Sequence, residues 1–249
     1  TTHYSLLTTH YSLLTTHYQK SIRNFTSYRR ILSSPKSLIK IRFHLNQFRP
    51  NTQISIFPPA IKALLLWNAI VFLATTNIFV GGWTPLGDIL KPFMVLQPFG
   101  DGFMPWQLVT YMFLHADLSH IFFNMIALWI FGQSLEQLWG TKRFVIYYFL
   151  TGMGAGLVHL IISGGLAIGA SGAVFGILLG FGMMFPNRYI ILLFPPIPIK
   201  AKYFVGIYGM IELYSGVTRA DSGVAHFAHL GGLLVGFILI KLWNLKKAE

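Results

Sequence analysis

The chain has 249 residues, of which 54% are apolar and only 10% are charged, and its mean hydropathy is +0.58. An ordinary soluble domain carries about 25% charged residues, so this composition excludes a typical water-soluble protein and indicates that most of the chain faces lipid or other helices. The net charge is +12 and there is no cysteine, which excludes an acidic protein, a disulfide framework and a thiolate site.

Residues 1–55 are expected to form a basic, disordered N-terminal tail. Residues 1–19 repeat TTHYSLL, but the copies are too few for a coiled coil, and we interpret them as a tandem DNA repeat. Eight of the nineteen Lys and Arg lie in 20–49, which holds no Asp or Glu. Such a block is typical of a transit peptide or a cytoplasmic tail. We favour the tail, and its place beside a membrane domain argues against nucleic-acid binding.

Residues 56–245 are expected to form one all-α polytopic membrane domain, followed by a short basic tail at 246–249. Six apolar segments are each about long enough to cross ~30 Å of hydrocarbon. They are 61–80, 119–139, 143–163, 171–186, 201–216 and 225–243. The polar, Gly- and Pro-rich stretch 81–118 predicts a large interfacial first loop with short helices. The prolines in 187–200 predict a connecting loop rather than a span.

The distribution of basic residues predicts the orientation of these six segments. With both termini in the cytoplasm, seventeen Lys and Arg lie inside and only Lys91 and Arg219 lie outside. Without the N-terminal tail the ratio is still nine to two, which is a strong positive-inside bias. The second, fourth and sixth segments therefore all begin at the outer side.

Four polar residues lie where those three segments begin, and polar groups inside spans indicate a function by default. His120 and Asn124 are four residues apart and share a helix face. Ser171 follows Gly169 at a turn that enters a helix, where backbone N–H groups favour an oxyanion. His229 is the obvious base to take the proton of the Ser171 hydroxyl.

Glycines at every fourth position predict that the fourth and sixth segments pack closely. The fourth segment carries Gly172 and Gly176, and the sixth carries Gly232 and Gly236 on the face of His229. Each of these patterns alone has a plain packing explanation. Their agreement on one leaflet favours a site.

Four other ionisable residues are interpreted mainly as structural rather than catalytic. His159 is expected to be a packed, hydrogen-bonded histidine, and His226 a structural neighbour of His229. Glu212 is expected to pair within the helix bundle, or else to help gate access. Asp221, eight residues before His229, is interpreted as a loop residue rather than a third acid.

Four motifs, in this order along the chain, resemble those of the rhomboid intramembrane serine proteases. They are HIFFN at 120–124, the set Glu136, Gly140 and Arg143, GASGAVFG at 169–176 and AHLGGLLVG at 228–236. The resemblance implies a six-transmembrane-helix rhomboid-like bundle with a Ser171–His229 catalytic dyad and no essential acid. It implies oxyanion donors at His120, Asn124 and the Ser171 backbone N–H. It also implies that Glu136 ties down the first loop.

The implied reaction is hydrolysis of peptide bonds in or near the transmembrane segments of other proteins, without metal or cofactor. The expected partners are transmembrane substrates and the lipid bilayer; the oligomeric state is left open. The alternatives are an inactive rhomboid-like protein that binds membrane clients, and a small transporter, although no internal repeat supports a transporter. The expected location is the bacterial inner membrane, because mitochondrial members usually carry a further span before the six.

The chain departs from the family pattern in its first loop and beside the nucleophile. Trp83 and Trp106 are not followed by the arginine that members often carry. Phe175 stands where many members have Tyr, and its ring is expected to pack on His229. Tyr111 stands where some members carry a His, while His115 keeps the neighbouring one.

Overall fold

The computed structural model describes residues 56–77, 82–100, 102–192, 196–218 and 224–243. The expected tails at 1–55 and 246–249, and Asp221, lie outside these residues. The described chain is mostly helical, as predicted. Its elements are α3 (Pro59–Thr75), α4 (Pro85–Met94), α5 (Gln107–Thr110), the 3₁₀ helix η1 (Tyr111–Phe113), α6 (Leu118–Trp139), α7 (Thr141–Ile162), α8 (Ser171–Met184), β1 (Tyr189–Ile191), β2 (Pro198–Lys200), α9 (Ala201–Thr218) and α10 (His226–Leu242).

A helix begins in or within two residues of each of the six predicted apolar segments, but the helices differ in length. Of the described helices, α6 and α7, with 22 residues each, are long and apolar enough to cross a membrane. Helices α3, α8 and α10 are apolar but have 17, 14 and 17 residues. The number of spans therefore stays a prediction.

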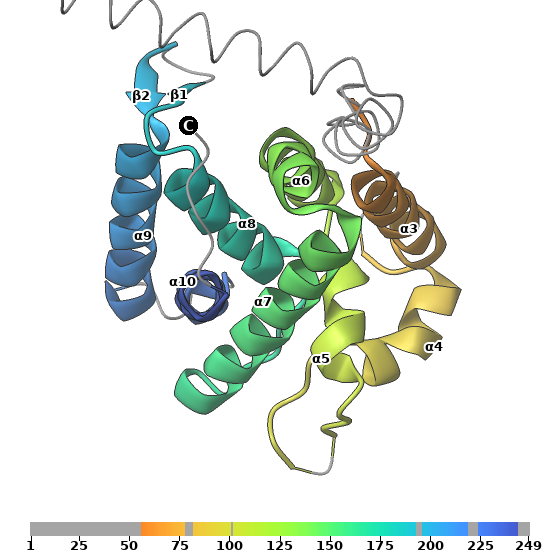
Figure 1. Cartoon of the computed structure of the whole chain (residues 1–249). Coiled ribbons are helices and arrows are strands. Elements are labelled where there is room, and N and C mark those ends of the chain that lie inside the picture. The colour runs from red at the N-terminus through yellow and green to blue at the C-terminus, as the bar shows by residue number, and fades with distance from the viewer. Residues whose placement is uncertain (1–55, 78–81, 101, 193–195, 219–223, 244–249) are drawn as a thin grey trace, which may run out of the picture. The chain divides into compact units, whose positions relative to one another are not determined.

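Helix α8 lies at the centre of the helical bundle. Its sequence is apolar on every side, and eleven of its fourteen residues are buried, which fits a helix that is enclosed rather than amphipathic. Helices α6, α7, α9 and α10 pack against it, and α10 lies between α7 and α9 (Figure 1). Ser171, the first residue of α8, is half-buried at one end of this central helix.

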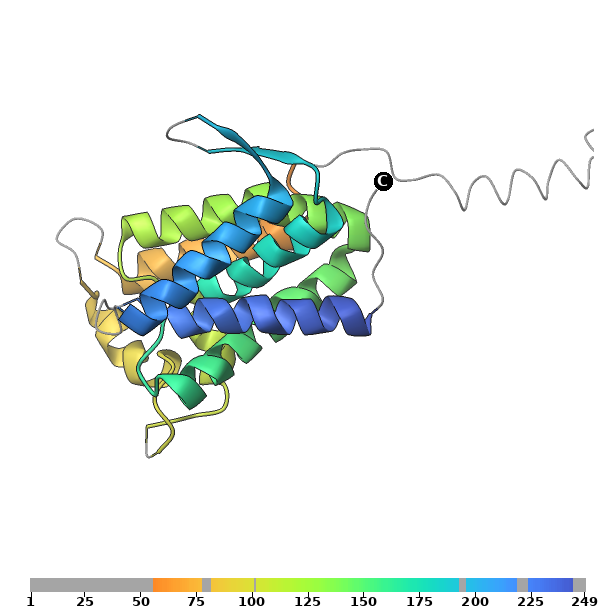
Figure 2. The ribbon, with the colours of Figure 1, turned by 90° about the vertical axis from the view of Figure 1, so that its left-hand side faces the viewer.

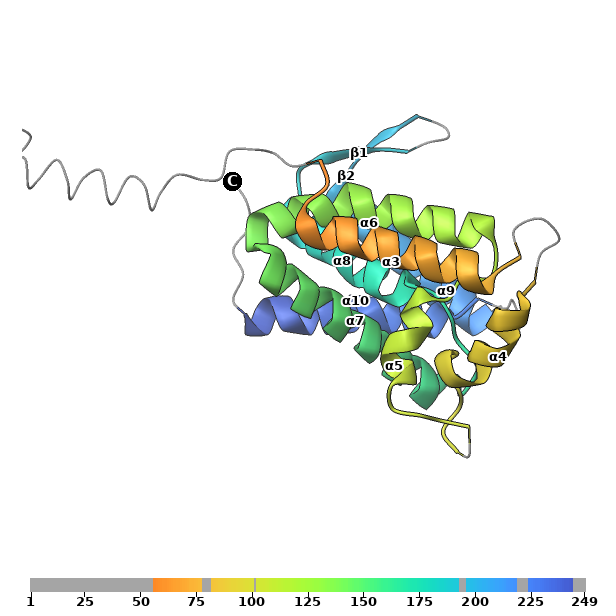
Figure 3. The same cartoon turned by 90° about the vertical axis from the view of Figure 1, so that its right-hand side faces the viewer.

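The stretch 82–117 contains the short helices α4, α5 and η1, as predicted, beside one end of α3 and α6 (Figure 3). The side chain of Gln107 is fully buried in this loop and holds it together. Its Oε1 accepts hydrogen bonds from the backbone N–H groups of Gln97 and Met104, and its Nε2 donates to the carbonyls of Pro92 and Gly102.

The expectation that Glu136 ties down the first loop is wrong. Glu136 lies near the C-terminal end of α6, whereas the loop joins the N-terminal end of that helix. Its carboxylate instead accepts hydrogen bonds from the backbone N–H groups of Ala60 and Ile61, both at 2.9 Å, and from the Thr141 hydroxyl at 2.7 Å. Glu136 therefore caps the first turn of α3, where free N–H groups favour a negative charge.

The described part of 187–200 forms no helix and connects α8 to α9, as predicted, and it also contains a two-stranded ladder. Strands β1 and β2 pair antiparallel, with Ile190 opposite Ile199, and lie beyond the N-terminal end of α9 (Figure 2). The β-branched isoleucines favour strands. Pro198 is tolerated because it occupies the last pair of the ladder, opposite Ile191.

Candidate active site

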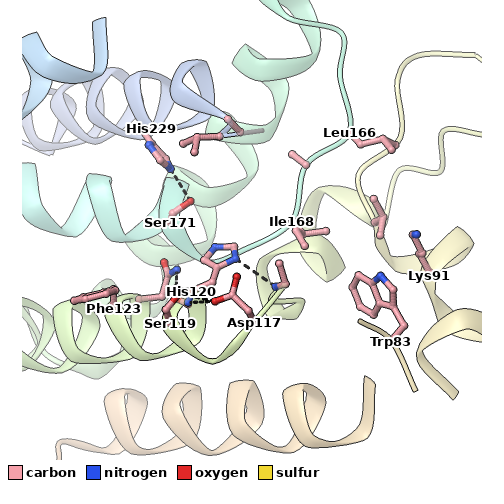
Figure 4. A pocket seen from close by; sticks show the side chains of 16 residues that line it. Trp83, Lys91, Asp117, Ser119, His120, Phe123, Leu166, Ile168, Ser171 and His229 are labelled. Atoms are coloured by element: carbon pink, nitrogen blue, oxygen red, sulfur yellow. Dashed lines mark hydrogen bonds between the residues drawn. The ribbon is translucent and has the colours of Figure 1, made fainter. Parts of the chain in front are cut away.

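The side chains of Ser171 and His229 meet at one end of the bundle (Figure 4). His229 Nε2 lies 2.8 Å from Ser171 Oγ. Ser171 begins α8 and His229 lies in the first turn of α10, so the contact joins two helix N-termini that are 58 residues apart in the chain. An imidazole nitrogen at this distance can take the hydroxyl proton.

Glycines bring α8 and α10 this close. A Cβ added to Gly232 would overlap the carbonyl oxygen of Gly172, and one added to Gly236 would lie 3.3 Å from the Cα of Gly176. A Cβ on Gly172 would lie 2.5 Å from the Cβ of Ala155 in α7. Larger residues would push the helices apart, and the hydrogen bond between Ser171 and His229 would lengthen.

The turn before Ser171 is held by Gly169, which has a φ of +113°. Its N–H donates a 2.8 Å hydrogen bond to the carbonyl of Tyr111. The Tyr111 hydroxyl donates a 2.7 Å bond to the carbonyl of Gly152. A Cβ at Gly169 would lie 2.6 Å from His120 Nε2, so only glycine allows both this backbone conformation and the approach of His120.

The geometry of His120 leaves one ring nitrogen free to donate. The backbone N–H of Ala116 points at His120 Nδ1 from 3.4 Å; an acceptor at Nδ1 places the proton of the neutral ring on Nε2. Nε2 is the atom that faces Gly169, next to Ser171. Asn124 Nδ2 donates one proton to the His120 carbonyl at 2.8 Å and has a second to offer.

His120, Asn124, Ser171 and His229 line one cavity of about 680 Å³. Its wall also carries Lys91, whose ammonium lies 5.6 Å from the Trp83 ring centroid, and Asp117. Figure 4 shows His229, Ser171 and His120 close together, with Lys91 and Trp83 on the far side of the pocket. The first loop and the N-terminal ends of three helices thus form a pocket with both a nucleophile and donors for an oxyanion.

Two residues just before α6 set the position of His120. Asp117 caps α6 by accepting from the His120 N–H at 2.8 Å and from the Ser119 hydroxyl at 2.6 Å, and the hydroxyl bond, followed by the N–H bond, lowers the pKa of Asp117. The His115 ring packs edge to face on His120, with centroids 5.0 Å apart. Burial, reinforced by the nearby His120, lowers the pKa of His115 to about 3.

Glu212 of α9 also reaches His229. Its Oε2 lies 2.9 Å from His229 Nδ1 and 2.7 Å from His226 Nδ1. The expected pairing of Glu212 within the bundle is therefore found, although the sequence did not identify its partners. The one feature of the sequence that pointed to Glu212 was its charge, because it is the only acidic residue in the predicted fifth span.

These three side chains also bear on whether a metal could bind. Their ligand atoms all lie within 4.8 Å of one another, a spacing that a metal ion could use. Each imidazole Nδ1, however, lies at direct hydrogen-bond distance from the carboxylate. Hydrogen bonds between the two imidazoles and the carboxylate are therefore enough to account for the close spacing of these three side chains.

The remaining residues singled out from the sequence lie in the fold around the contact between Ser171 and His229 rather than in the contact itself. Phe175 stacks on His229, as expected. His159 is buried and its Nε2 lies 3.1 Å from the Gly165 carbonyl, as expected for a packed histidine. Gly140 joins α6 to α7 with a φ of +80°. Arg143 is exposed in the first turn of α7.

Comparison with known proteins gives one consistent result. A family model described as "Rhomboid domain" matches residues 102–244. The chain is 31% identical over 148 residues to the rhomboid protease GluP of Bacillus subtilis, covering 57% of this chain and 27% of that protein. It is 30% identical over 148 residues to Rhomboid-like protease 3 of Toxoplasma gondii, covering 59% and 55%.

A third relative carries a mitochondrial name. The chain is 31% identical over 142 residues to RHOMBOID-like protein 6, mitochondrial, of Arabidopsis thaliana, covering 54% of this chain and 42% of that protein. The matched segment thus spans between about a quarter and about half of these relatives. Bacterial and mitochondrial names occur together, so the relatives do not support the expected bacterial inner membrane over an organelle.

Proposed function

This chain belongs to the rhomboid family, and from that premise we propose that it is an intramembrane serine endopeptidase. The observation that carries the proposal is the 2.8 Å contact between Ser171 Oγ and His229 Nε2 inside a cavity. An inactive client-binding protein has no need for a nucleophile in contact with a base. The rhomboid family is membrane-integral, and the substrates we propose are the transmembrane segments of other proteins.

The proposed first half of the reaction forms an acyl-enzyme. Ser171 Oγ attacks the carbonyl carbon of the scissile peptide bond while His229 Nε2 takes the hydroxyl proton. The carbonyl oxygen becomes an oxyanion, which the Ser171 backbone N–H, His120 Nε2 and Asn124 Nδ2 stabilise. The C–N bond then breaks, and His229 gives its proton to the leaving amine.

The second half of the reaction regenerates the enzyme. A water molecule attacks the ester carbon as His229 Nε2 takes one of its protons, and the same donors stabilise the second oxyanion. The ester C–O bond breaks, His229 returns the proton to Ser171 Oγ, and the new carboxyl end departs. A peptide bond in a regular helix is shielded, so we expect substrates with Gly, Pro or polar residues near the cut.

The proposed membrane arrangement has six spans formed by α3, α6, α7, α8, α9 and α10, with both termini on the cytoplasmic side. Large apolar side chains support lipid contact, because they are exposed on the outer faces of these helices; examples are Leu66 in α3, Phe122 in α6 and Met210 in α9. The short helix α8 fits this arrangement because other helices enclose it, and we expect its N-terminus, at the cavity, to begin below the membrane surface.

A reconstituted assay tests the proposal. The protein in liposomes is mixed with a fluorescent transmembrane substrate and, separately, with a fluorophosphonate probe. We expect the parent and the Ser163→Ala variant, which changes an exposed serine at the end of α7, to cut the substrate and to be labelled. Ser171→Ala is expected to do neither. Equal turnover by Ser171→Ala would contradict a serine mechanism. A parent that binds the substrate but is neither labelled nor active would favour client binding.

A further inference from the structure

Glu212 brings a carboxylate to the side of His229 that faces away from Ser171. We propose that Glu212 is a positioning residue that fixes the orientation and tautomer of His229, so that this enzyme uses a Ser171–His229–Glu212 arrangement rather than a Ser–His pair alone. This inference rests on the proposed function. It contrasts with the absence of an essential acid that the family resemblance implied.

The hydrogen bonds select one tautomer of His229. An ionised carboxylate only accepts hydrogen bonds, so Nδ1, at 2.9 Å from Glu212 Oε2, must carry a proton. The neutral ring then presents a lone pair at Nε2, which lies 2.8 Å from Ser171 Oγ. This is the only tautomer of the neutral ring that can take the serine proton.

The carboxylate is itself held in place. His226 Nδ1 lies 2.7 Å from the same Oε2, and His226 precedes His229 by one turn on α10. Glu212 is 8% exposed, so little solvent competes for these bonds. The link runs from α9 to α10, whose contact is visible in Figure 2.

The ring of His229 is thereby constrained in two directions. Phe175 stacks on its face at 4.3 Å with an interplanar angle of 7°, which restricts tilting. Glu212 holds its Nδ1 edge, which restricts rotation in the plane of the ring. When His229 accepts the Ser171 proton, the imidazolium lies beside a carboxylate, and the opposite charges stabilise the state in which the oxyanion forms.

The first experiment compares Glu212→Gln with the parent in liposomes. Loss of a carboxylate that selects the tautomer costs about 10⁴-fold in a well-studied triad. We expect kcat and the rate constant of fluorophosphonate labelling to fall by at least about 100-fold, with KM within about threefold of the parent, because substrate binding does not involve Glu212.

Glu136→Gln is the matched control, because it makes the same substitution at a buried glutamate that caps α3. It is expected to lower the melting temperature in detergent while the labelling rate per folded molecule stays at the parent's value. If Glu212→Gln does not fold, Glu212→Asp replaces it. The shorter acid should slow labelling by about tenfold to a hundredfold, within the cost of a displaced catalytic group, and labelling at the parent's rate would overturn the proposal.

A double-variant cycle separates positioning from a general structural role. A residue that acts through His229 has no effect once His229 is removed. The slow residual labelling of His229→Ala and of His229→Ala/Glu212→Gln is therefore expected to be equal. A further loss in the double variant would overturn the positioning role.

The outcomes also distinguish the two proposals. If the parent is neither active nor labelled, the proposed function fails. If the parent is labelled and Glu212→Gln is labelled equally fast, the proposed function stands and only the role of Glu212 fails.

Discussion

The ring of Phe175 lies flat against the imidazole of His229, with centroids 4.3 Å apart and planes within 7° of parallel. Phe175 stacks in turn on Tyr208 of α9, with centroids 5.3 Å apart. The ring that we propose as the base is therefore the end of a stack of aromatic side chains from three helices. This stack gives a physical reason for an aromatic residue four positions after the serine.

Replacing Phe175 with Leu tests the stack. Leucine keeps an apolar side chain but has no flat face, so His229 gains freedom to tilt. Because displacing a catalytic group by about 1 Å can cost about 100-fold, we expect kcat to fall by about tenfold. Single-turnover cleavage in liposomes measures this. Phe175→Tyr keeps the ring and should match the parent; an equally slow Tyr variant would argue against stacking as the cause.

Replacing Gly232 with Ala tests the close approach of α8 and α10. The added methyl group would overlap the Gly172 carbonyl, and overpacking of this kind costs about 1–3 kcal/mol. We expect a lower melting temperature in detergent and slower fluorophosphonate labelling of Ser171.

Gly206→Ala is the control for that substitution. A Cβ at this position in α9 meets no atom within 4 Å, and alanine is favoured over glycine in a helix by about 1 kcal/mol. The control should be at least as stable as the parent and be labelled at the same rate. Similar losses in both variants would mean that the helix contact does not explain the glycine pattern.

Replacing His120 or Asn124 with Ala tests the oxyanion site. Removing one oxyanion donor typically lowers kcat by about 10²–10³-fold, and we expect that loss in each variant with KM little changed. Steady-state cleavage in liposomes separates the two constants. A rise in KM with unchanged kcat would instead assign the residue to substrate binding.

Because His115 is buried as a neutral imidazole, we expect the folded protein to lose stability in mild acid. The folded protein holds this imidazole neutral, with its pKa lowered to about 3 by burial and by His120, and neither ring nitrogen has a hydrogen-bond partner among the described residues. In the unfolded chain its pKa is about 6.5. The folded pKa is the lower one, so the unfolded state binds the proton first as pH falls below 6.5, and stability decreases by up to about 1.4 kcal/mol per pH unit.

Thermal unfolding in detergent between pH 7.5 and 4.5 measures this dependence. His115→Phe keeps an aromatic ring but cannot take up a proton, so its melting temperature should fall less with acid than that of the parent. Parallel curves for the two proteins would assign the acid sensitivity to other groups.

The positions of the helices could be predicted from the sequence because apolar runs and breakers are local. The same holds for Ser171 and His229, whose placement at the starts of alternate apolar segments puts them at one end of a bundle. The spacing of Gly232 and Gly236 specifies a smooth helix face, which depends only on the helical period. The sequence predicted that 187–200 connects two helices but not that β1 and β2 pair there, since strand pairing depends on two segments meeting.

Only the tertiary structure decided which buried acid serves which partner. Glu136 and Glu212 are both carboxyls in apolar segments, and although Glu136 belongs to a motif, nothing local indicates which groups either of them bonds. Because α6 packs on α3, the Glu136 carboxylate accepts hydrogen bonds from two backbone N–H groups. Because α9 packs on α10, the Glu212 carboxylate lies at hydrogen-bond distance from two imidazoles. The sequence by itself determined that each buried carboxylate needs a partner, because burying an unpaired charge costs too much free energy. Which partner each carboxylate has depends on how whole helices are rotated and packed against one another, and only the tertiary structure fixes that.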